Sequence, residues 1–242
     1  MGFSEDRSVE QPTIGLFGNL GYETVDLFNE SFGLENPLGR ETSSDVVLRK
    51  RLRQKLVEFN PSASEEIINA AINELTKDRS SLSLARANQE IYELLKNGIK
   101  IQTANDKGEG ITEIVQVINW NTPENNHFLL ASQMWITGEL HNRRPDLIGF
   151  VNGLPLILFE LKKFTVNVKH AYDNNLSDYL DTIPQLFWYN AFVILSNGLE
   201  SRIGTFNAPW EHFNEWKRIS ERDEGKVSLD TIIRGTCEKT GY

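Results

Sequence analysis

Hydrophobic residues recur with two different periods along the chain. From residue 44 to residue 97 they return at every third or fourth position, which is typical of amphipathic helices. We therefore predict helices over residues 44–59, 64–75 and 82–95, with Ser44 and Ser64 as N-caps and Gly98 as a C-cap residue. A shorter apolar stripe before Gly21 predicts one more helix near the N-terminus, and the polar stretch 29–43 predicts a loop.

From residue 98 onward the pattern changes to short apolar runs separated by turn signals such as Asn152-Gly153. A helical stretch over residues 168–180 interrupts these runs, and an amphipathic stretch over residues 210–219 follows them. The runs predict strands over residues 99–103, 111–120, 127–137, 147–151, 154–159, 191–195 and 202–206.

This order of elements predicts an α/β fold in which a mostly antiparallel central sheet carries one inserted helix behind an N-terminal helical region. We expect a single domain over residues 1–242. Within it, residues 1–97 form the mainly helical front, residues 98–220 form the sheet core, and residues 221–242 begin a linker.

Composition places the chain among ordinary globular proteins. Hydrophobic residues make up 39% of its 242 residues, and 13 Phe, 5 Trp and 6 Tyr supply enough core material to argue against disorder. Cys237 is the single cysteine, which excludes a disulfide framework and a cysteine zinc site. The polar N-terminus is unlike a secretory signal and no apolar run is long enough for a membrane helix, so we expect a cytoplasmic protein.

The formal net charge of −9 argues against a protein that coats nucleic acid by bulk charge. It does not exclude a nuclease, because carboxylates that bind metal carry the same sign.

Candidate chemistry is concentrated in residues 143–163, which read RRPDLIGFVNGLPLILFELKK. Two apolar strands flank the Asn152-Gly153 turn, Asp146 precedes the first strand, and Glu160 and Lys162 end the second. Residues two apart in a strand share a face, so Glu160 and Lys162 point together.

Whether Asp146 joins them depends on the register of this hairpin. A two-residue Asn152-Gly153 loop places Asp146 opposite Phe159, whereas a loop of three residues places it opposite Glu160. We therefore predict a connection of three or more residues with a bulge, although Asn-Gly is the strongest signal for a two-residue turn.

Both strands are apolar on both faces, so the carboxylates at their end are poorly solvated and repel each other. A Mg²⁺ ion held by Asp146, Glu160 and the Leu161 backbone carbonyl would neutralise them, with Lys162 orienting a water molecule. The alternative is a solvated strand end without catalytic function.

Basic residues suggest contacts with DNA phosphates. Helix 44–59 carries five cations within seven positions, among them Arg49 and Arg53, which either contact phosphates or form a solvated face. Arg143 and Arg144 either contact the DNA backbone or pair with acidic neighbours. The four histidines show no metal-binding spacing, and no serine or cysteine nucleophile motif is present.

The chain resembles the N-terminal nuclease domain of the restriction (motor) subunit of type I restriction–modification enzymes. The resemblance rests on WNTPENN and NRRPDLIGFVNGLPLILFELK within residues 119–163, on LRKRLRQKL followed by Asn60-Pro61, and on IPQLFWYNAFVILSNGLESRIGTF before APWEHFNEWK. Matches of this kind extend over nearly the whole chain.

The resemblance implies a restriction-endonuclease-like PD-(D/E)xK fold, a mixed central sheet flanked by helices, with Asp146, Glu160 and Lys162 as the catalytic centre. It also suggests Glu10 as an extra acid near the metal, although an exposed helix glutamate is an equal alternative. The family's Gln-x-x-x-Tyr helper motif falls on Asn175 and Tyr179, where Asn replaces Gln and Tyr179 has packing as its alternative role.

A complete Gln-x-x-x-Tyr occurs at Gln185 and Tyr189, where the resemblance does not place it. Asn119 stands where the family more usually has Asp.

The resemblance further implies a Mg²⁺-dependent endonuclease that cuts double-stranded DNA without reading its sequence. Its partners would be methyltransferase and specificity subunits and the helicase-like motor domains of the same subunit. Those domains would bind ATP and translocate DNA; the chain itself has no phosphate-binding loop and is expected to be a fragment. The alternative function is a non-catalytic docking or DNA-guiding module that retains the fold.

Overall fold

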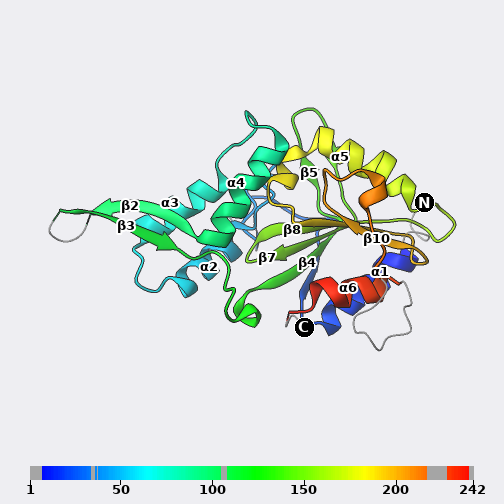
Figure 1. Cartoon of the computed structure of the whole chain (residues 1–242), viewed down its shortest axis with the longest axis horizontal. Coiled ribbons are helices and arrows are strands. Elements are labelled where there is room, and N and C mark those ends of the chain that lie inside the picture. The colour runs from blue at the N-terminus through cyan, green and yellow to red at the C-terminus, as the bar shows by residue number, and fades with distance from the viewer. Residues whose placement is uncertain (1–6, 34–35, 37, 105–107, 217–227, 240–242) are drawn as a thin grey trace.

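A six-stranded mixed sheet forms the centre of the molecule (Figure 1). The computed structural model describes residues 7–33, 36, 38–104, 108–216 and 228–239. In spatial order the strands are β1 (Glu23–Asp26), β4 (Phe128–Ser132), β7 (Leu147–Val151), β8 (Leu154–Leu161), β9 (Phe192–Ser196) and β10 (Ser201–Gly204). Strands β1 and β4 pair in parallel, as do β8 and β9, and the remaining pairs are antiparallel.

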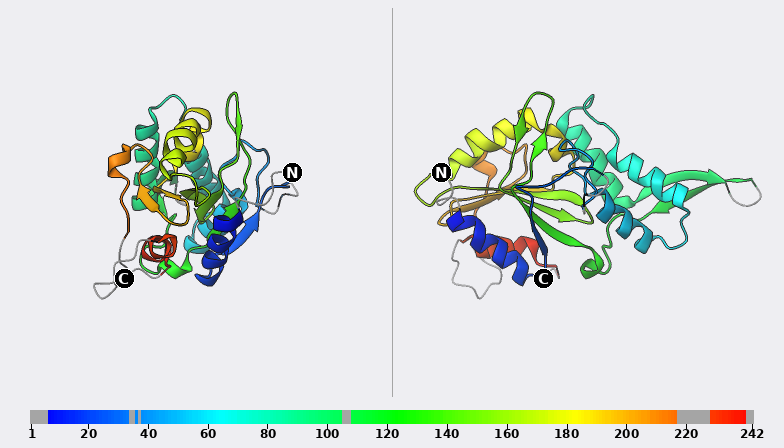
Figure 2. Two further views of the ribbon diagram at one scale, coloured as in Figure 1. Left: turned by 90° about the vertical axis from the view of Figure 1, so that its right-hand side faces the viewer. Right: turned by 180° about the vertical axis from the view of Figure 1, so that it is seen from behind.

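Helices cover both faces of this sheet (Figure 2). On one face lie α1 (Arg7–Asn19) and α6 (Leu229–Cys237). On the other lies one continuous helix made of a π-helical segment, η2 (Ala171–Leu176), and α5 (Ser177–Thr182). Because successive residues of a strand point to opposite faces, Leu158 packs on the α5 side while Phe159 and Leu161 pack on the α1 side.

The remaining helices lie beside the sheet at the end farther from α1 (Figure 1). Ser64 caps α3 and Ser83 caps α4 through backbone N–H groups three residues later, as expected for helix N-caps. Strands β2 and β3 form a separate hairpin that projects from the body. The other elements are α2 (Arg49–Phe59), α3 (Glu65–Thr76), α4 (Leu84–Asn97), β2 (Ile99–Ala104), β3 (Gly110–Val115), β5 (Ile136–Thr137), β6 (Asn142–Arg143) and the short turns η1 (Pro123–Asn125), η3 (Pro184–Trp188) and η4 (Trp210–His212).

The helix predicted to begin after Ser44 begins at Arg49 instead. The Asp45 carboxylate accepts hydrogen bonds from the backbone N–H groups of Glu41 and Thr42, which closes a local turn before the helix. The Leu48 N–H then donates to the Gly153 carbonyl, so the chain docks on the β7–β8 turn before it becomes helical.

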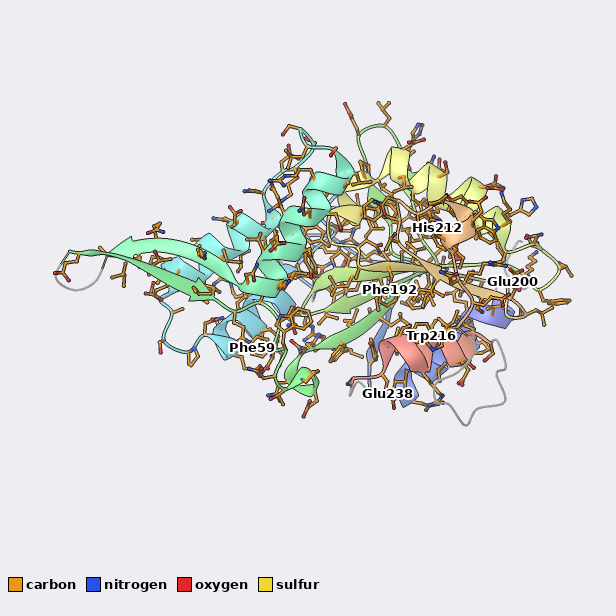
Figure 3. The ribbon with its side chains drawn as sticks, viewed as in Figure 1. Phe59, Phe192, Glu200, His212, Trp216 and Glu238 are labelled. Carbon is orange, nitrogen blue, oxygen red and sulfur yellow. The ribbon has the colours of Figure 1, made fainter. Side chains whose placement is uncertain are left out.

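Two predictions near the C-terminus differ from the structure. The stretch 210–219 forms only the turn η4, after which Asn214 exchanges two backbone hydrogen bonds with Ile203; residues 217–219 lie outside the described part. In the range expected to begin a linker, the described residues form α6, and Trp216 packs against Gly235 of that helix (Figure 3). The reason is an apolar stripe that the prediction overlooked: Leu229, Ile232, Ile233 and Cys237.

In the described residues, no helix combines the length and apolar character needed to cross a membrane.

Candidate catalytic site

The hairpin of β7 and β8 positions the candidate residues, and its turn is shorter than predicted. Val151 pairs with Leu154, so Asn152 and Gly153 alone form the loop. Both have positive φ, 51° and 82°, as a two-residue type I′ turn requires. The prediction of a longer loop is therefore wrong.

The predicted register is nevertheless correct near the site, because a β-bulge supplies the missing residue. Phe150 pairs with Pro155 but Gly149 pairs with Ile157, which leaves Leu156 as the extra residue of β8. From there Leu147 pairs with Phe159. One step farther, the same register places Asp146 opposite Glu160, as predicted.

Four side chains meet at this end of the sheet. The Asp146 Oδ2 atom accepts a hydrogen bond from the Leu161 backbone N–H at 2.7 Å. Lys162 Nζ lies 2.8 Å from Glu160 Oε1, and the Tyr179 hydroxyl donates to Glu160 Oε2 at 3.0 Å. Asp146, Glu160 and Lys162 lie on the sheet face covered by α5, and Tyr179 reaches them from α5 itself. The Leu161 side chain packs on the opposite face.

Burial dominates the electrostatics of Glu160, whose residue is only 2% exposed. Loss of solvation and the neighbouring Asp146 carboxylate raise the pKa of Glu160 to about 8, although Lys162 and the Tyr179 hydroxyl favour its charged form. Burial and Glu160 also raise the pKa of Tyr179, so its hydroxyl remains a donor at neutral pH. Lys162 alone therefore does not offset the burial of Glu160 and the repulsion from Asp146, and a bound cation would add the missing positive charge.

The donors present fit a divalent cation that prefers oxygen ligands. Asp146 and Glu160 contribute carboxylates. In the continued register the residue opposite Leu161 is Pro145, which has no N–H to offer the Leu161 carbonyl, so this oxygen is suited to a metal. No group of three or more acidic, histidine or cysteine side chains close enough to hold a metal occurs in the described ranges, so water would complete the coordination.

Glu10 of α1 reaches the site through a residue that the sequence did not point to. Glu10 is 7% exposed, and its Oε2 atom accepts a hydrogen bond from Gln133 Nε2 at 3.0 Å. The Gln133 backbone N–H in turn donates to the Asp146 carbonyl at 3.0 Å. Gln133 has a φ of 56°, a conformation usually signalled by Gly or Asn, so no sequence signal marked it. Glu10 thus supports Asp146 rather than exposing a solvated carboxylate.

Asn175 and Tyr179 form a chain that leads to Glu160. Asn175 lies in the π-helical segment and partly offsets the burial that raises the pKa of Tyr179, whose hydroxyl donates to Glu160. A π-helical turn is often found at functional sites. The complete Gln-x-x-x-Tyr at Gln185 and Tyr189 makes structural contacts instead. Gln185 donates to the Thr137 carbonyl and Tyr189 donates to the Leu75 carbonyl.

The two arginines before Asp146 have different environments. Arg143 forms a two-pronged pair with the Asp178 carboxylate of α5, with its second nitrogen 2.7 Å from Asp178 Oδ1. Arg144 instead stacks between two rings, 4.8 Å from the Phe28 centroid and 5.0 Å from the Trp135 centroid. The sequence left DNA contact or pairing with acidic neighbours open for both arginines. Pairing with an acidic neighbour holds for Arg143 and not for Arg144.

Arg49 and Arg53 lie apart from the carboxylates. Helix α2 docks on the Asn152-Gly153 turn, which follows the C-terminal end of β7, whereas Asp146 precedes its N-terminal end. Arg53 donates to Asn69, and both arginines line a separate pocket of about 260 Å³. The structure does not bring them to the candidate site. Asn119 also lies outside it and accepts a hydrogen bond from the Thr122 N–H in a local turn.

Comparison with known proteins gives concordant matches over most of the chain. Residues 2–212 match the family model described as type I restriction enzyme R protein N terminus. The type I restriction enzyme HindI endonuclease subunit of Haemophilus influenzae is 31% identical over 228 residues, 90% of this chain and 21% of that protein. The putative type I restriction enzyme MjaIXP endonuclease subunit of Methanocaldococcus jannaschii is 30% identical over 236 residues, 93% of this chain and 21% of that protein. The chain spans about a fifth of the length of these curated relatives.

Proposed function

The chain belongs to the family of type I restriction enzyme R protein N termini, and from that premise we propose that it is a Mg²⁺-dependent DNA endonuclease domain. It hydrolyses phosphodiester bonds of double-stranded DNA without reading the sequence at the cut. The names of its relatives as endonuclease subunits support this function.

The observation that carries the proposal is the meeting of Asp146, Glu160 and Lys162 at one end of β7 and β8. They come from an Asp before one strand and a Glu-x-Lys at the end of the next, flanked by helices on both faces of a mixed sheet. This arrangement supports a PD-(D/E)xK nuclease fold.

In this function Asp146, Glu160 and the Leu161 carbonyl hold Mg²⁺. When bound, Mg²⁺ would supply Lewis-acid polarisation of the scissile phosphate and would make the attacking water more acidic. Tyr179 fixes the orientation of Glu160 by donating to its Oε2 atom. Lys162 orients the attacking water and stabilises the negative charge that develops on the phosphate, because its ammonium group already lies at the carboxylate.

Sequence recognition and ATP-driven translocation belong to other parts of the assembly in this proposal. The motor domains of the same subunit bind ATP and present DNA, while methyltransferase and specificity subunits select the target. Such a division agrees with a domain whose net charge of −9 gives no bulk attraction to DNA.

A second candidate is a non-catalytic module that docks or guides DNA. Asn175 in place of the family's Gln favours it, because the helper motif is altered. Divalent-ion binding separates the candidates: titration of Mn²⁺ into the chain should show binding that Glu160→Ala abolishes and that Glu200→Ala, at a half-buried surface position, retains. Absence of carboxylate-dependent binding would favour the guiding module.

A further inference from the structure

Two aromatic rings and one arginine form a surface beside the candidate site that the proposed chemistry does not use. Phe28, Phe32 and Trp135 remain 37%, 41% and 38% exposed, although large aromatic side chains usually bury most of their area. The guanidinium of Arg144 lies over the rings of Phe28 and Trp135. We refer to Phe28, Trp135 and Arg144 as the stacking platform.

Sheet topology places this platform next to the carboxylates. Phe28 follows β1, Trp135 follows β4, and Arg144 precedes β7. Strands β1 and β4 are parallel, and β4 and β7 are antiparallel. The C-terminal ends of β1 and β4 and the N-terminal end of β7 therefore lie side by side at the same end of the sheet. Adjacent strands are ~4.8 Å apart, so the rings follow strands that lie within two strand spacings of Asp146, about 10 Å.

Arg40, whose side chain is fully buried, anchors the backbone of Trp135 in this platform. Arg40 donates to the backbone carbonyls of Trp135 and Ser43 at 2.7 and 3.1 Å and pairs with Glu30. Its guanidinium also lies 5.1 Å from the Phe32 ring. Arg40 thereby joins Glu30 and Ser43 to the segment after β4, which fixes the backbone that carries Trp135.

Arg144 has its polar edge available. It makes no hydrogen bond or ion pair with any residue that the structure describes, and its contacts there are the two rings. A guanidinium has five N–H donors and is suited to phosphate, while an exposed ring is suited to stacking a base. Basic and aromatic groups combined in this way are characteristic of surfaces that bind single-stranded nucleic acid.

We propose that the stacking platform binds one unpaired nucleotide of the DNA strand that is held at the Asp146–Glu160 pair. The base stacks on Trp135 and its phosphate binds Arg144. Bases within a duplex are stacked on one another, so one base of the double-stranded DNA must leave its pair before it reaches these rings. This inference rests on the proposed nuclease function for the identity of the neighbouring site, but the binding itself does not require cleavage.

Two probes of equal length and equal charge test the base contact. The full chain, in buffer with a chelator to prevent cleavage, is titrated into fluorescein-labelled oligothymidylate and into an oligomer of abasic residues. We expect the thymidylate to bind about tenfold or more tightly, from stacking of one base. Trp135→Leu should abolish that preference without weakening abasic binding, whereas Arg144→Gln should weaken both probes.

Matched variants guard against general effects. Trp120→Leu removes a tryptophan that is 60% exposed and lies after β3, away from the carboxylates, and should retain the preference for bases. Trp135→Phe keeps a ring and should retain most of the preference, which separates loss of stacking from loss of folding. Equal binding of both probes by the unmodified chain would overturn the proposal, as would an undiminished preference in Trp135→Leu.

A duplex competitor tests the requirement for unpaired bases. Duplex of the same length should displace the thymidylate poorly, and a duplex containing a short gap should displace it better. If intact duplex binds as tightly as single strands and loses the same affinity in Trp135→Leu, the assignment to unpaired bases is overturned. Glu160→Gln should retain base-dependent binding while losing divalent-ion-dependent cleavage. If the unmodified chain binds bases but does not cleave DNA, the nuclease function fails while the stacking platform stands.

Discussion

The Tyr179 hydroxyl donates a hydrogen bond of 3.0 Å to Glu160 Oε2, while Lys162 occupies the other oxygen of the same carboxylate at 2.8 Å. One buried carboxylate is therefore oriented by two donors from different elements, α5 and the residue after β8. In the proposed function Tyr179 is a positioning residue, because its hydroxyl contacts Glu160.

Tyr179→Phe should weaken divalent-ion binding or cleavage by about 10–100-fold, the usual effect of removing a partner of a metal ligand. The phenyl ring retains the packing, but Glu160 loses a donor that favours its charged form. Tyr172→Phe is the matched control, since Tyr172 lies on the same helix and donates to the Ala208 carbonyl instead. Equal ion affinity and cleavage in both variants would refute the positioning role.

The raised pKa of Glu160 makes the stability of the ion-free chain depend on pH. The pKa of Glu160 is about 8 in the folded chain and ordinarily 4.5, so between these values the folded state binds more protons than the unfolded state. The free energy of unfolding should therefore decrease as pH rises from about 4.5 to about 8. Thermal unfolding followed by circular dichroism over this range measures the effect.

Glu160→Gln should flatten this pH dependence, because the amide does not titrate, while Glu200→Gln on the surface should preserve it. Saturating Mg²⁺ should restore stability at the alkaline end of the range, since the ion binds only the folded site. An ion-free chain whose midpoint stays constant or rises with pH would contradict this account of Glu160.

Lys162→Ala in the complete restriction enzyme should abolish double-strand cleavage, because the group that stabilises the developing charge is removed. ATP hydrolysis and DNA translocation should persist, as both are proposed to reside in other domains. Plasmid linearisation measured beside phosphate release gives the comparison. Lys169→Ala, whose ammonium pairs with Asp173 on the surface, should cleave normally; normal cleavage by Lys162→Ala would disprove the role of Lys162.

Gly153→Ala should destabilise the chain by about 1–3 kcal/mol, the usual cost of a non-glycine residue in a strained backbone conformation. Gly153 has a φ of 82°, and an added Cβ would lie 2.5 Å from the Leu48 carbonyl oxygen. Gly110→Ala provides the control, because a Cβ there meets nothing within 4 Å and its backbone is not left-handed. Urea unfolding of the two variants should differ by that amount, and equal midpoints would show that the α2 docking contact is dispensable.

Sequence periodicity predicted the central hairpin and the shared face of Glu160 and Lys162 because these depend on local alternation. It missed β1, whose residues Glu23–Asp26 contain a single large apolar side chain and form a strand only by pairing with β4. Likewise, the support of Asp146 by Gln133 arises from contacts between distant segments. The later start of α2 follows from the competing Asp45 turn, which propensity alone does not weigh.

The Leu156 bulge makes the spacing of the candidate residues Asp146 and Glu160 tolerant of length variation. In a regular hairpin with a two-residue turn, an Asp and a Glu that are 13 positions apart would lie opposite each other. Asp146 and Glu160 are one position farther apart, and the extra residue at the bulge restores the same pairing. Deleting Leu156 should therefore straighten β8 without separating Asp146 from Glu160. Related chains that differ by one residue between these carboxylates can share one geometry, so alignments that penalise this gap will underestimate how many of them retain the site.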